Sequence, residues 1–316
     1  MSIATELAEL TLEINQRCPN QCLFCSSFAR RDARSLLTVA EVHMIGRQAA
    51  ELGVRKLSIS GGEPLVHPHI VEIVNDLRDT CSELALYTTG QVFGGRCESV
   101  AFKEWELFRR ANPTLVFNVQ STVESIHDEL AGRPGAFCLS RTSLIAAREQ
   151  GFHVEVHIVP NRLNIDTIES TVTDLANWGV DRISFLRLVP QGYARLNAER
   201  LLLDEDGQLK LAVVFQRLAG RCWGNTMLRF GIPFSGLVSH NKTCYAGERK
   251  LIVRYDGRVL PCEAFKDNRH SRFILGDIRT DTLIDILARG RSSSCIRELK
   301  HYASASDPCP AQLLHH

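Results

Sequence analysis

The sequence predicts an α/β protein built on a parallel β-sheet. Six short runs rich in β-branched and aromatic residues begin about 30 to 45 residues apart, as strands of such a sheet do. Amphipathic stretches with helix-start and helix-stop residues lie between them. Because parallel neighbours need a crossover, usually a helix, this alternation favours a parallel sheet. Periodicity alone leaves open whether the sheet is open or curves into an incomplete barrel.

Several of the stretches between the expected strands carry a recognisable helix-start or helix-stop signal. The expected strands are Leu10–Asn15, Arg55–Ser60, Leu84–Thr89, Thr114–Gln120, His153–Val159 and Arg182–Leu188. Thr38 and Glu41 form a capping box that starts the first helix. Gly53, Gly151 and Gly179 stand where later helices should stop before the next strand.

The character of the chain changes after about residue 229. Ile232–Gly236 breaks the strand and helix rhythm, and Lys250–Leu260 is typical of a β-hairpin with a two-residue turn at Asp256-Gly257. A helix from about Thr282 to Ala288 and a loose tail follow. No low-complexity linker intervenes, so we expect a small C-terminal module packed on the larger domain.

Composition excludes several classes of protein. The chain has 316 residues, and its 37 Lys and Arg nearly balance 36 Asp and Glu, for a net charge of +1. At roughly 150 residues per domain, about two domains are expected. Balanced charge argues against nucleic-acid and membrane-surface partners. No apolar run approaches the roughly 20 residues that span a bilayer, and no secretory signal is present, so we expect a cytoplasmic protein with no membrane partner.

Eleven cysteines are the main anomaly, because an odd number without an export signal fits metal ligation better than disulfides. Cys18, Cys22 and Cys25 follow the first strand, where α/β proteins place their chemistry. Three thiolates can hold an iron–sulfur cube and leave its fourth iron without a protein ligand. The alternatives are a zinc site, which needs a fourth ligand that this loop lacks, or three packing thiols.

This spacing resembles the defining motif of the radical S-adenosylmethionine (SAM) enzymes, in which an aromatic residue, here Phe24, precedes the last cysteine. Ser60–Pro64, directly after the second strand, is similar to the GGEP segment of the same family. The resemblance covers about residues 8–190 and implies a TIM-like partial (β/α)6 barrel. It also implies a [4Fe–4S] cluster that transfers one electron to bound SAM and releases a 5′-deoxyadenosyl radical. A reducing partner such as flavodoxin or ferredoxin would supply the electron.

The resemblance implies roles for the residues around SAM. Gly61 and Gly62 allow close backbone approach, Glu63 accepts hydrogen bonds from the SAM ammonium, and Pro64 stiffens the segment. Backbone atoms of Phe24 flank the adenine. Two further expected SAM contacts are Asn118, at the ribose, and Arg187, at the carboxylate; for Arg187 a salt bridge is an equally good interpretation.

A second set of cysteines lies near the C-terminus. Cys244 and Cys262 flank the predicted hairpin, which brings them together, and they resemble the opening of the SPASM and twitch extensions that bind auxiliary clusters. We expect one auxiliary [4Fe–4S] cluster, with Cys309 as a further ligand and Cys295 either a ligand or buried in a helix. If Cys295 is not a ligand, that cluster has an open iron. A small zinc ribbon is the alternative. The chain then divides into a barrel, residues 1–230, and a cluster module, residues 231–316.

Two further residues have catalytic interpretations. Cys222 precedes the C-terminal module and is a candidate hydrogen-atom donor to a substrate radical, with burial as a packing residue as the alternative. Tyr193 follows the sixth strand, where a barrel presents residues that contact substrate.

The function expected from these features is a radical SAM enzyme that oxidises its substrate, because the second cluster can accept the remaining electron. The pattern from His127 to Phe137 looks like that of peptide maturases, so a ribosomal peptide is the first expectation. Only about ten residues precede the first strand, which leaves no room for a leader-binding domain and keeps a dehydrogenase or epimerase of a small metabolite, such as an amino sugar, as an alternative. The competing class is a non-enzymatic zinc- and iron-binding regulator.

Overall fold

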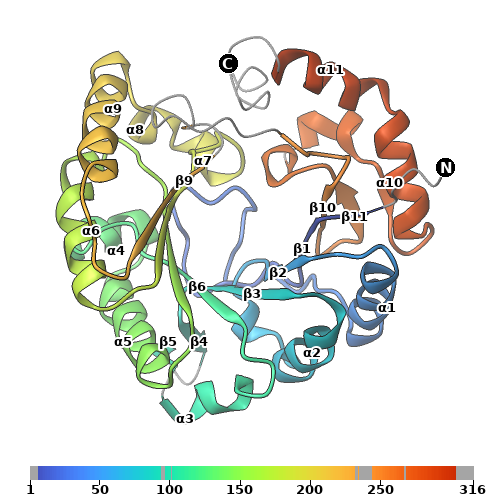
Figure 1. The fold of residues 1–316 in the computed structure, drawn as a ribbon, viewed down its shortest axis with the longest axis horizontal. Helices are drawn as coiled ribbons and strands as arrows, with labels where there is room; N and C mark the ends of the chain where they lie inside the picture. The colour runs from blue at the N-terminus through green and yellow to red at the C-terminus, as the bar shows by residue number, and fades with distance from the viewer. Residues whose placement is uncertain are drawn as a thin grey trace.

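The computed structural model describes residues 6–93, 97–100, 102–231, 234, 244–266 and 268–303. All six expected strands form and lie parallel in one sheet: β1 (Glu9–Glu13), β2 (Lys56–Ser60), β3 (Glu83–Thr88), β6 (Thr114–Asn118), β7 (Val154–Ile158) and β8 (Arg182–Phe185). Figure 1 shows this sheet bent into an arc with helices along its outer side. The expected partial barrel is confirmed.

The helices between the strands form where their signals predict. The capping box is present, with the Glu41 N–H donating to the Thr38 hydroxyl and the Thr38 N–H donating to the Glu41 carboxylate. The helices preceding β10 are α1 (Val39–Glu51), α2 (Ile70–Leu77), α3 (Phe102–Trp105), α4 (Glu124–Ala131), α5 (Ala136–Glu149), α6 (Ile168–Asn177), α7 (Tyr193–Leu196), α8 (Ala198–Leu201) and α9 (Glu205–Ala219). A small hairpin, β4 (Gln91–Phe93) and β5 (Cys97–Ser99), follows β3.

A seventh parallel strand, β9 (Met227–Phe230), pairs with β8 and was not predicted. The strand has only four residues, and the side chains of Met227 and Arg229 are exposed. It therefore lacks the run of buried apolar residues that identifies the other strands.

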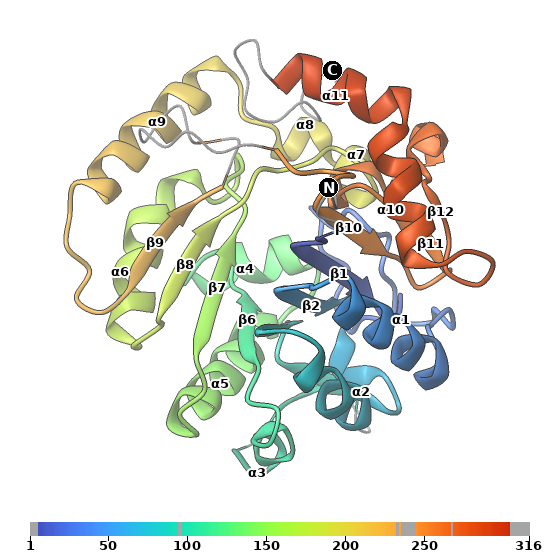
Figure 2. The ribbon, with the colours of Figure 1, turned by 45° about the vertical axis from the view of Figure 1, so that its right-hand side comes forward.

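The C-terminal hairpin extends the barrel sheet. Its first strand, β10 (Lys250–Val253), pairs in parallel with β1, followed by β11 (Arg258–Leu260) and β12 (Gly276–Asp277). Figure 2 shows β10 and β11 continuing the sheet beyond β1, with α10 (Leu283–Ser292) beside them and α11 (Ser294–Ala303) following. The expected Thr282–Ala288 helix is α10, which runs on to Ser292. The division between residues 230 and 231 stays a prediction.

The expected two-residue turn of the hairpin is wrong. The Arg254 N–H donates to the Arg258 carbonyl (2.9 Å), and the Gly257 N–H donates to the Arg254 carbonyl (2.9 Å). Three residues therefore form the loop, with Gly257 in the left-handed region at φ 88°. This is the type I turn with a glycine bulge that three-residue hairpins favour.

The two faces of the sheet differ in polarity. The outer face contributes fully buried apolar side chains such as Leu12, Phe117 and Ile183 to the core beneath the helices. On the inner face, the register of β6 to β9 aligns Asn118, His157, Ser184 and Arg229 in one row. The barrel interior is therefore polar near the carboxyl ends of its strands. No helix of the described residues is long and apolar enough to cross a membrane.

Candidate active site

A cavity of about 480 Å³ lies at the carboxyl ends of the barrel strands. Its size is in the range of cofactor and small-molecule sites. Its lining includes ten residues for which the sequence predicts a role: Cys18, Cys22, Phe24, Cys25, Gly61, Gly62, Asn118, Arg187, Cys244 and Cys262. The fold thus brings the N-terminal cysteine loop and the hairpin cysteines to one space.

The cysteine loop, residues 18–25, is held in place by the end of α4. The Gln21 N–H donates to the Ala131 carbonyl (3.1 Å), and the Leu23 N–H donates to the Leu130 carbonyl (2.9 Å). The loop has no regular secondary structure, but backbone hydrogen bonds on both sides of Cys22 fix its conformation.

The donor chemistry of this loop fits an iron–sulfur cluster. Burial, reinforced by the neighbouring thiols, raises the pKa of Cys18 and Cys22 well above the ordinary range. Thiolates form in such a place only when a metal is bound to them, and soft thiolates are the ligands of iron–sulfur clusters. Among the described residues, no three cysteine, histidine or acidic side chains close around a single metal ion. The assignment therefore rests on the cysteine spacing and the shared cavity.

Gly61 and Gly62 hold the GGEP segment against the entry to the cysteine loop. The Gly62 N–H donates to the Asn15 carbonyl (2.8 Å), and the Glu63 N–H donates to the Arg17 carbonyl (2.7 Å). A Cβ at Gly61 would lie 2.5 Å from the Asn15 oxygen, and one at Gly62 would lie 2.3 Å from the Arg17 oxygen. The missing side chains therefore allow two protein segments to touch, while both glycines also face the cavity.

Glu63 is completely buried, and its carboxylate is bound within the protein. One oxygen accepts hydrogen bonds from the Leu65 N–H (3.0 Å) and the Thr88 hydroxyl (2.8 Å); the other accepts from the N–H (2.6 Å) and hydroxyl (2.7 Å) of Thr89. Burial raises the pKa of Glu63 despite these donors. Pro64 opens the short helical turn that follows. Glu63 thus fastens the segment to the end of β3, and its contact with the SAM ammonium stays a prediction.

Gln120 joins the ends of β6 and β7 beside the cavity. Its side-chain amide donates to the Asn118 side-chain oxygen and to the His157 carbonyl, and its Oε1 accepts from the Val159 N–H (2.9 Å). The backbone N–H of Gln120 donates to Nδ1 of His127 (3.2 Å). No pattern in the sequence marks Gln120 beyond its place at the end of an expected strand.

His127 should make the apoprotein less stable in mild acid. Burial lowers its pKa to about 4, and Nδ1 accepts a hydrogen bond, so the folded state keeps the ring neutral. The unfolded state takes up a proton near pH 6.5, so this stability is present above pH 6.5 and lost as the pH falls toward 4. Between pH 7 and pH 5, wild type should lose about 2 kcal/mol more unfolding free energy than His127→Gln in urea titrations. Equal losses of unfolding free energy in wild type and His127→Gln would contradict the assignment of this pH dependence to His127.

The half-buried Tyr87 and the buried His157 form a pair on the inner face to which the sequence assigns no role. Their ring centroids lie 5.2 Å apart, edge to face, and both residues line the cavity. Burial raises the pKa of Tyr87 to about 12, and burial with nearby cations lowers the pKa of His157 to about 3. Both groups are therefore neutral at pH 7. Their signal in the sequence is a polar residue alternating with buried apolar ones along a strand.

The hairpin thiols face the same cavity next to a half-buried ion pair, in which the side chains of Lys250 and Glu263 are 27% and 35% exposed. Lys250 donates to the Glu263 carboxylate (2.9 Å), which also accepts from the Thr11 hydroxyl (2.8 Å). Burial raises the pKa of Cys262 to about 12, although the Lys250 ammonium opposes this. Cys244 and Cys262 both line the cavity, as expected for ligands of one cluster.

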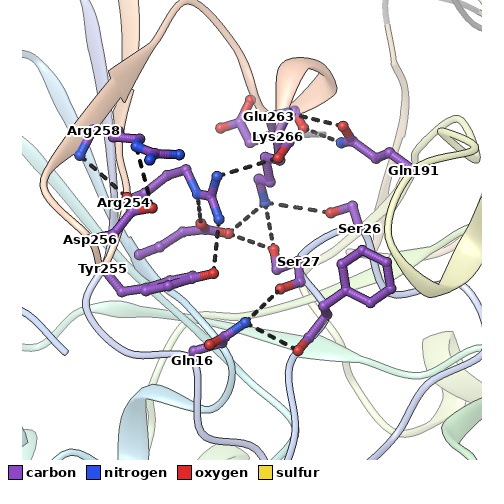
Figure 3. Close-up of polar contacts among 12 residues, drawn as sticks. Gln16, Ser26, Ser27, Gln191, Arg254, Tyr255, Asp256, Arg258, Glu263 and Lys266 are labelled. Carbon is purple, nitrogen blue, oxygen red and sulfur yellow. Dashed lines mark hydrogen bonds and ion pairs between the residues drawn. The ribbon is translucent and has the colours of Figure 1, made fainter. Parts of the chain in front are cut away.

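The segment Gln191–Tyr193, here called the strap, follows β8 and connects the cysteine loop to the C-terminal segment Glu263–Lys266. Figure 3 shows the Gln191 amide between Glu263 and Lys266: its Nε2 donates to the Glu263 carbonyl, and its Oε1 accepts from the Lys266 N–H (2.9 Å). The Tyr193 N–H donates to the Cys25 carbonyl (2.8 Å). This strap contacts both cysteine sites.

The two residues expected to be catalytic do not line the cavity. The Tyr193 ring packs edge to face against Phe28, 5.0 Å between centroids, and so supports the segment that follows the cysteine loop. Cys222 is exposed in the connection that precedes β9, so it lies toward the amino end of that strand, away from the cavity. The expected alternative, burial as a packing residue, is therefore wrong, and a role for Cys222 as a hydrogen-atom donor stays a prediction.

Cys295 and Cys309 are the two further cysteines considered as ligands of the auxiliary cluster. Cys295 lies in the first turn of α11 and outside the cavity lining, with its sulfur hydrogen-bonded to the Ser293 hydroxyl (2.8 Å) and the Arg272 carbonyl (3.4 Å). Cys309 lies outside the described residues. The ligation of an auxiliary cluster by either residue stays a prediction.

Known families match both parts of the chain. The model of the radical SAM superfamily matches residues 12–194, and that of the SPASM iron–sulfur cluster-binding domain matches residues 244–311. Two similar proteins are named PqqA peptide cyclase, from Xanthomonas campestris pv. campestris (strain 8004) and Ruegeria pomeroyi. Each is 25% identical, and each alignment covers 98% of this chain and 81% of the relative.

Solved structures share the fold. Streptococcus suis SuiB superposes with a TM-score of 0.70 at 18% identity, over 90% of this chain and 66% of SuiB. The structure titled native anSMEcpe with bound AdoMet and Cp18Cys peptide gives a TM-score of 0.68 at 13% identity, over 92% of this chain and 81% of that one.

The regulator interpretation is set aside, because these matches are to enzymes. The radical SAM model spans more than half of the 316 residues and includes both the cysteine loop and the GGEP segment. The chain therefore belongs to the radical SAM superfamily, whose cofactors are SAM and a [4Fe–4S] cluster, and it carries an iron–sulfur domain for an auxiliary cluster in its C-terminal part.

Proposed function

We propose that the chain is a peptide maturase that cleaves SAM and removes a hydrogen atom from a peptide, with net oxidation of that peptide. The observation that carries this proposal is the single cavity onto which both cysteine sites and the Gly61–Gly62 pair open. The PqqA peptide cyclase relatives and the structure of SuiB bound to its precursor peptide SuiA support a peptide as the substrate.

The first cluster and SAM are assigned to the barrel. Cys18, Cys22 and Cys25 would hold the cluster, and bound SAM would then supply a carbon radical able to remove an unactivated hydrogen. The chain positions SAM with Asn118, whose side chain Gln120 orients at the cavity wall. Phe24 and Arg187, which also line the cavity, complete the proposed SAM contacts.

The auxiliary cluster is assigned to the hairpin, residues 244–262. Cys244 and Cys262 would hold it, with Cys309 as a further proposed ligand. The half-buried Lys250 ammonium beside Cys262 favours an added electron there, which suits an acceptor in a net oxidation.

Anaerobic reconstitution tests this function. The chain should bind about eight irons and, with dithionite, convert SAM to 5′-deoxyadenosine. Flavodoxin or ferredoxin should replace dithionite. The enzyme should then remove two hydrogen atoms from a short peptide encoded beside the gene, and mass spectrometry of that peptide measures the loss. Zinc occupancy without SAM cleavage would contradict the proposal, and turnover of an amino sugar in place of the peptide would contradict the substrate.

A further inference from the structure

The side chain of Lys266, in the C-terminal segment, contacts the residues that directly follow the cysteine loop. Its Nζ donates to the Glu13 carboxylate (2.6 Å), to the Ser27 hydroxyl (3.0 Å) and to the Ser26 hydroxyl (3.4 Å). Glu13 ends β1, and the two serines directly follow Cys25. Figure 3 shows the Lys266 side chain directed at both serines from the C-terminal segment.

Two cations face the buried carboxylate of Glu13. The side chains of Lys266 and Arg254 are 8% and 10% exposed, and both face the Glu13 carboxylate, which is 1% exposed; the Arg254 Nε lies 3.7 Å from its Oε2. Two cations therefore contact one buried carboxylate, and Glu263 and Asp256 also favour the charged forms of Lys266 and Arg254, respectively. A cation held against the residues that follow Cys25 also favours an anion in the cysteine loop.

The cysteine loop supplies that anion when it holds a cluster. Lys266 and Cys25 both line the cavity. Burial disfavours the charged form of Lys266, but Glu13, Glu263 and the Cys25 sulfur together raise its pKa, so the side chain is an ammonium at pH 7. A fixed cation beside a thiolate ligand stabilises an electron added to the cluster, because charge and hydrogen bonds around the sulfurs tune its reduction potential.

We propose that Lys266 is a positioning residue by which the C-terminal part acts on the first cluster: its ammonium fixes the Cys25–Ser27 end of the loop and makes that cluster easier to reduce. This inference rests on the proposed cluster at Cys18, Cys22 and Cys25. The hairpin offers a matched comparison, because Lys250 is a second cavity-lining lysine in an ion pair, with Glu263, beside Cys262 instead.

The test uses the full chain carrying Cys262→Ala, so that the first cluster is observed alone. Lys266→Gln removes the charge but keeps a hydrogen-bond donor, Lys266→Arg keeps the charge, and Lys250→Gln is the matched control. Redox titration followed by electron paramagnetic resonance, without SAM, measures the midpoint potential. We expect a more negative potential for Lys266→Gln and little change for Lys266→Arg and Lys250→Gln. An unchanged potential in Lys266→Gln, or an equal shift in Lys250→Gln, would overturn the inference.

Iron content decides the case in which a variant does not assemble. If Lys266→Gln binds no iron while Lys266→Arg binds about four, the charge is needed to hold the loop, which supports the inference. Loss of iron in both variants would overturn it. Failure of the proposed function is distinguishable, because the unmodified chain would then bind no cluster or release no 5′-deoxyadenosine.

Discussion

Replacing Cys22 by alanine should abolish SAM cleavage, whereas replacing Cys262 by alanine should spare it and block the product. Cys22 is the middle thiol of the cysteine loop, and without it two thiolates remain for the first cluster. Cys262 belongs to the hairpin, so its loss removes the electron acceptor and leaves the SAM site intact. We expect 5′-deoxyadenosine at the protein-free background for Cys22→Ala, and within a few-fold of wild type for Cys262→Ala.

Iron analysis separates loss of a cluster from loss of the fold. Each variant should retain about four irons of the eight in wild type, because each removes one cluster. Cys138→Ala is the control, since this thiol is exposed on α5 and remote in sequence from both cysteine sites; it should behave as wild type. Equal loss of SAM cleavage in Cys22→Ala and Cys262→Ala would mean that the hairpin thiols are structural.

The parallel strands were predictable because their signal is local. The six strands expected from apolar runs are all present, and the capping box predicts the start of α1. The strand β9 was missed because its stability comes from pairing with β8 and not from its own four residues. The pairing of β10 with β1 was also missed, because a hairpin sequence does not state which strand it will lie beside.

In the candidate site, likewise, the residues in local motifs were predictable and the contacts between distant parts of the chain were not. The three loop cysteines and the two glycines of the GGEP segment, which motifs of fixed spacing identify, all line the cavity. The contact of Lys266 with Glu13 joins residues 253 positions apart, and the hydrogen bond from Thr11 to Glu263 joins residues 252 positions apart. No sequence pattern reports such contacts. The exposure of Cys222 was not predicted for a related reason: β9, which follows it, was not recognised, so the end of the barrel to which Cys222 belongs was unknown.

The glycine pair shows that a correct motif can have an additional structural reason. Close approach to SAM predicts glycine at positions 61 and 62, and both residues do line the cavity. The structure shows that the nearest atoms to a Cβ at either position are backbone atoms of Asn15, Gln16 and Arg17. The GGEP segment and the cysteine loop therefore depend on each other for their positions.

Gly62→Ala should consequently damage both stability and SAM cleavage. Its Cβ would lie 2.3 Å from the Arg17 carbonyl oxygen, and a backbone atom cannot move aside as a flexible side chain does. The two segments must separate, which strains the hydrogen bonds from Gly62 to Asn15 and from Glu63 to Arg17. We expect unfolding in urea to show a loss of about 2–4 kcal/mol in the apoprotein, from overpacking and weakened buried hydrogen bonds. Formation of 5′-deoxyadenosine should fall at least tenfold, since a loss of about 1.4 kcal/mol in transition-state stabilisation already has that effect.

Gly220→Ala separates this steric effect from the general cost of replacing glycine. Gly220 follows α9 at φ −81°, and its nearest neighbour to a Cβ is 3.4 Å away, so alanine fits without strain. Its unfolding free energy should stay within about 0.5 kcal/mol of wild type. Gly62 likewise lies outside the left-handed region, so the two substitutions differ in available space and not in the sign of φ. If Gly62→Ala proved as stable and as active as Gly220→Ala, the contact between the GGEP segment and the cysteine loop would not be what positions SAM.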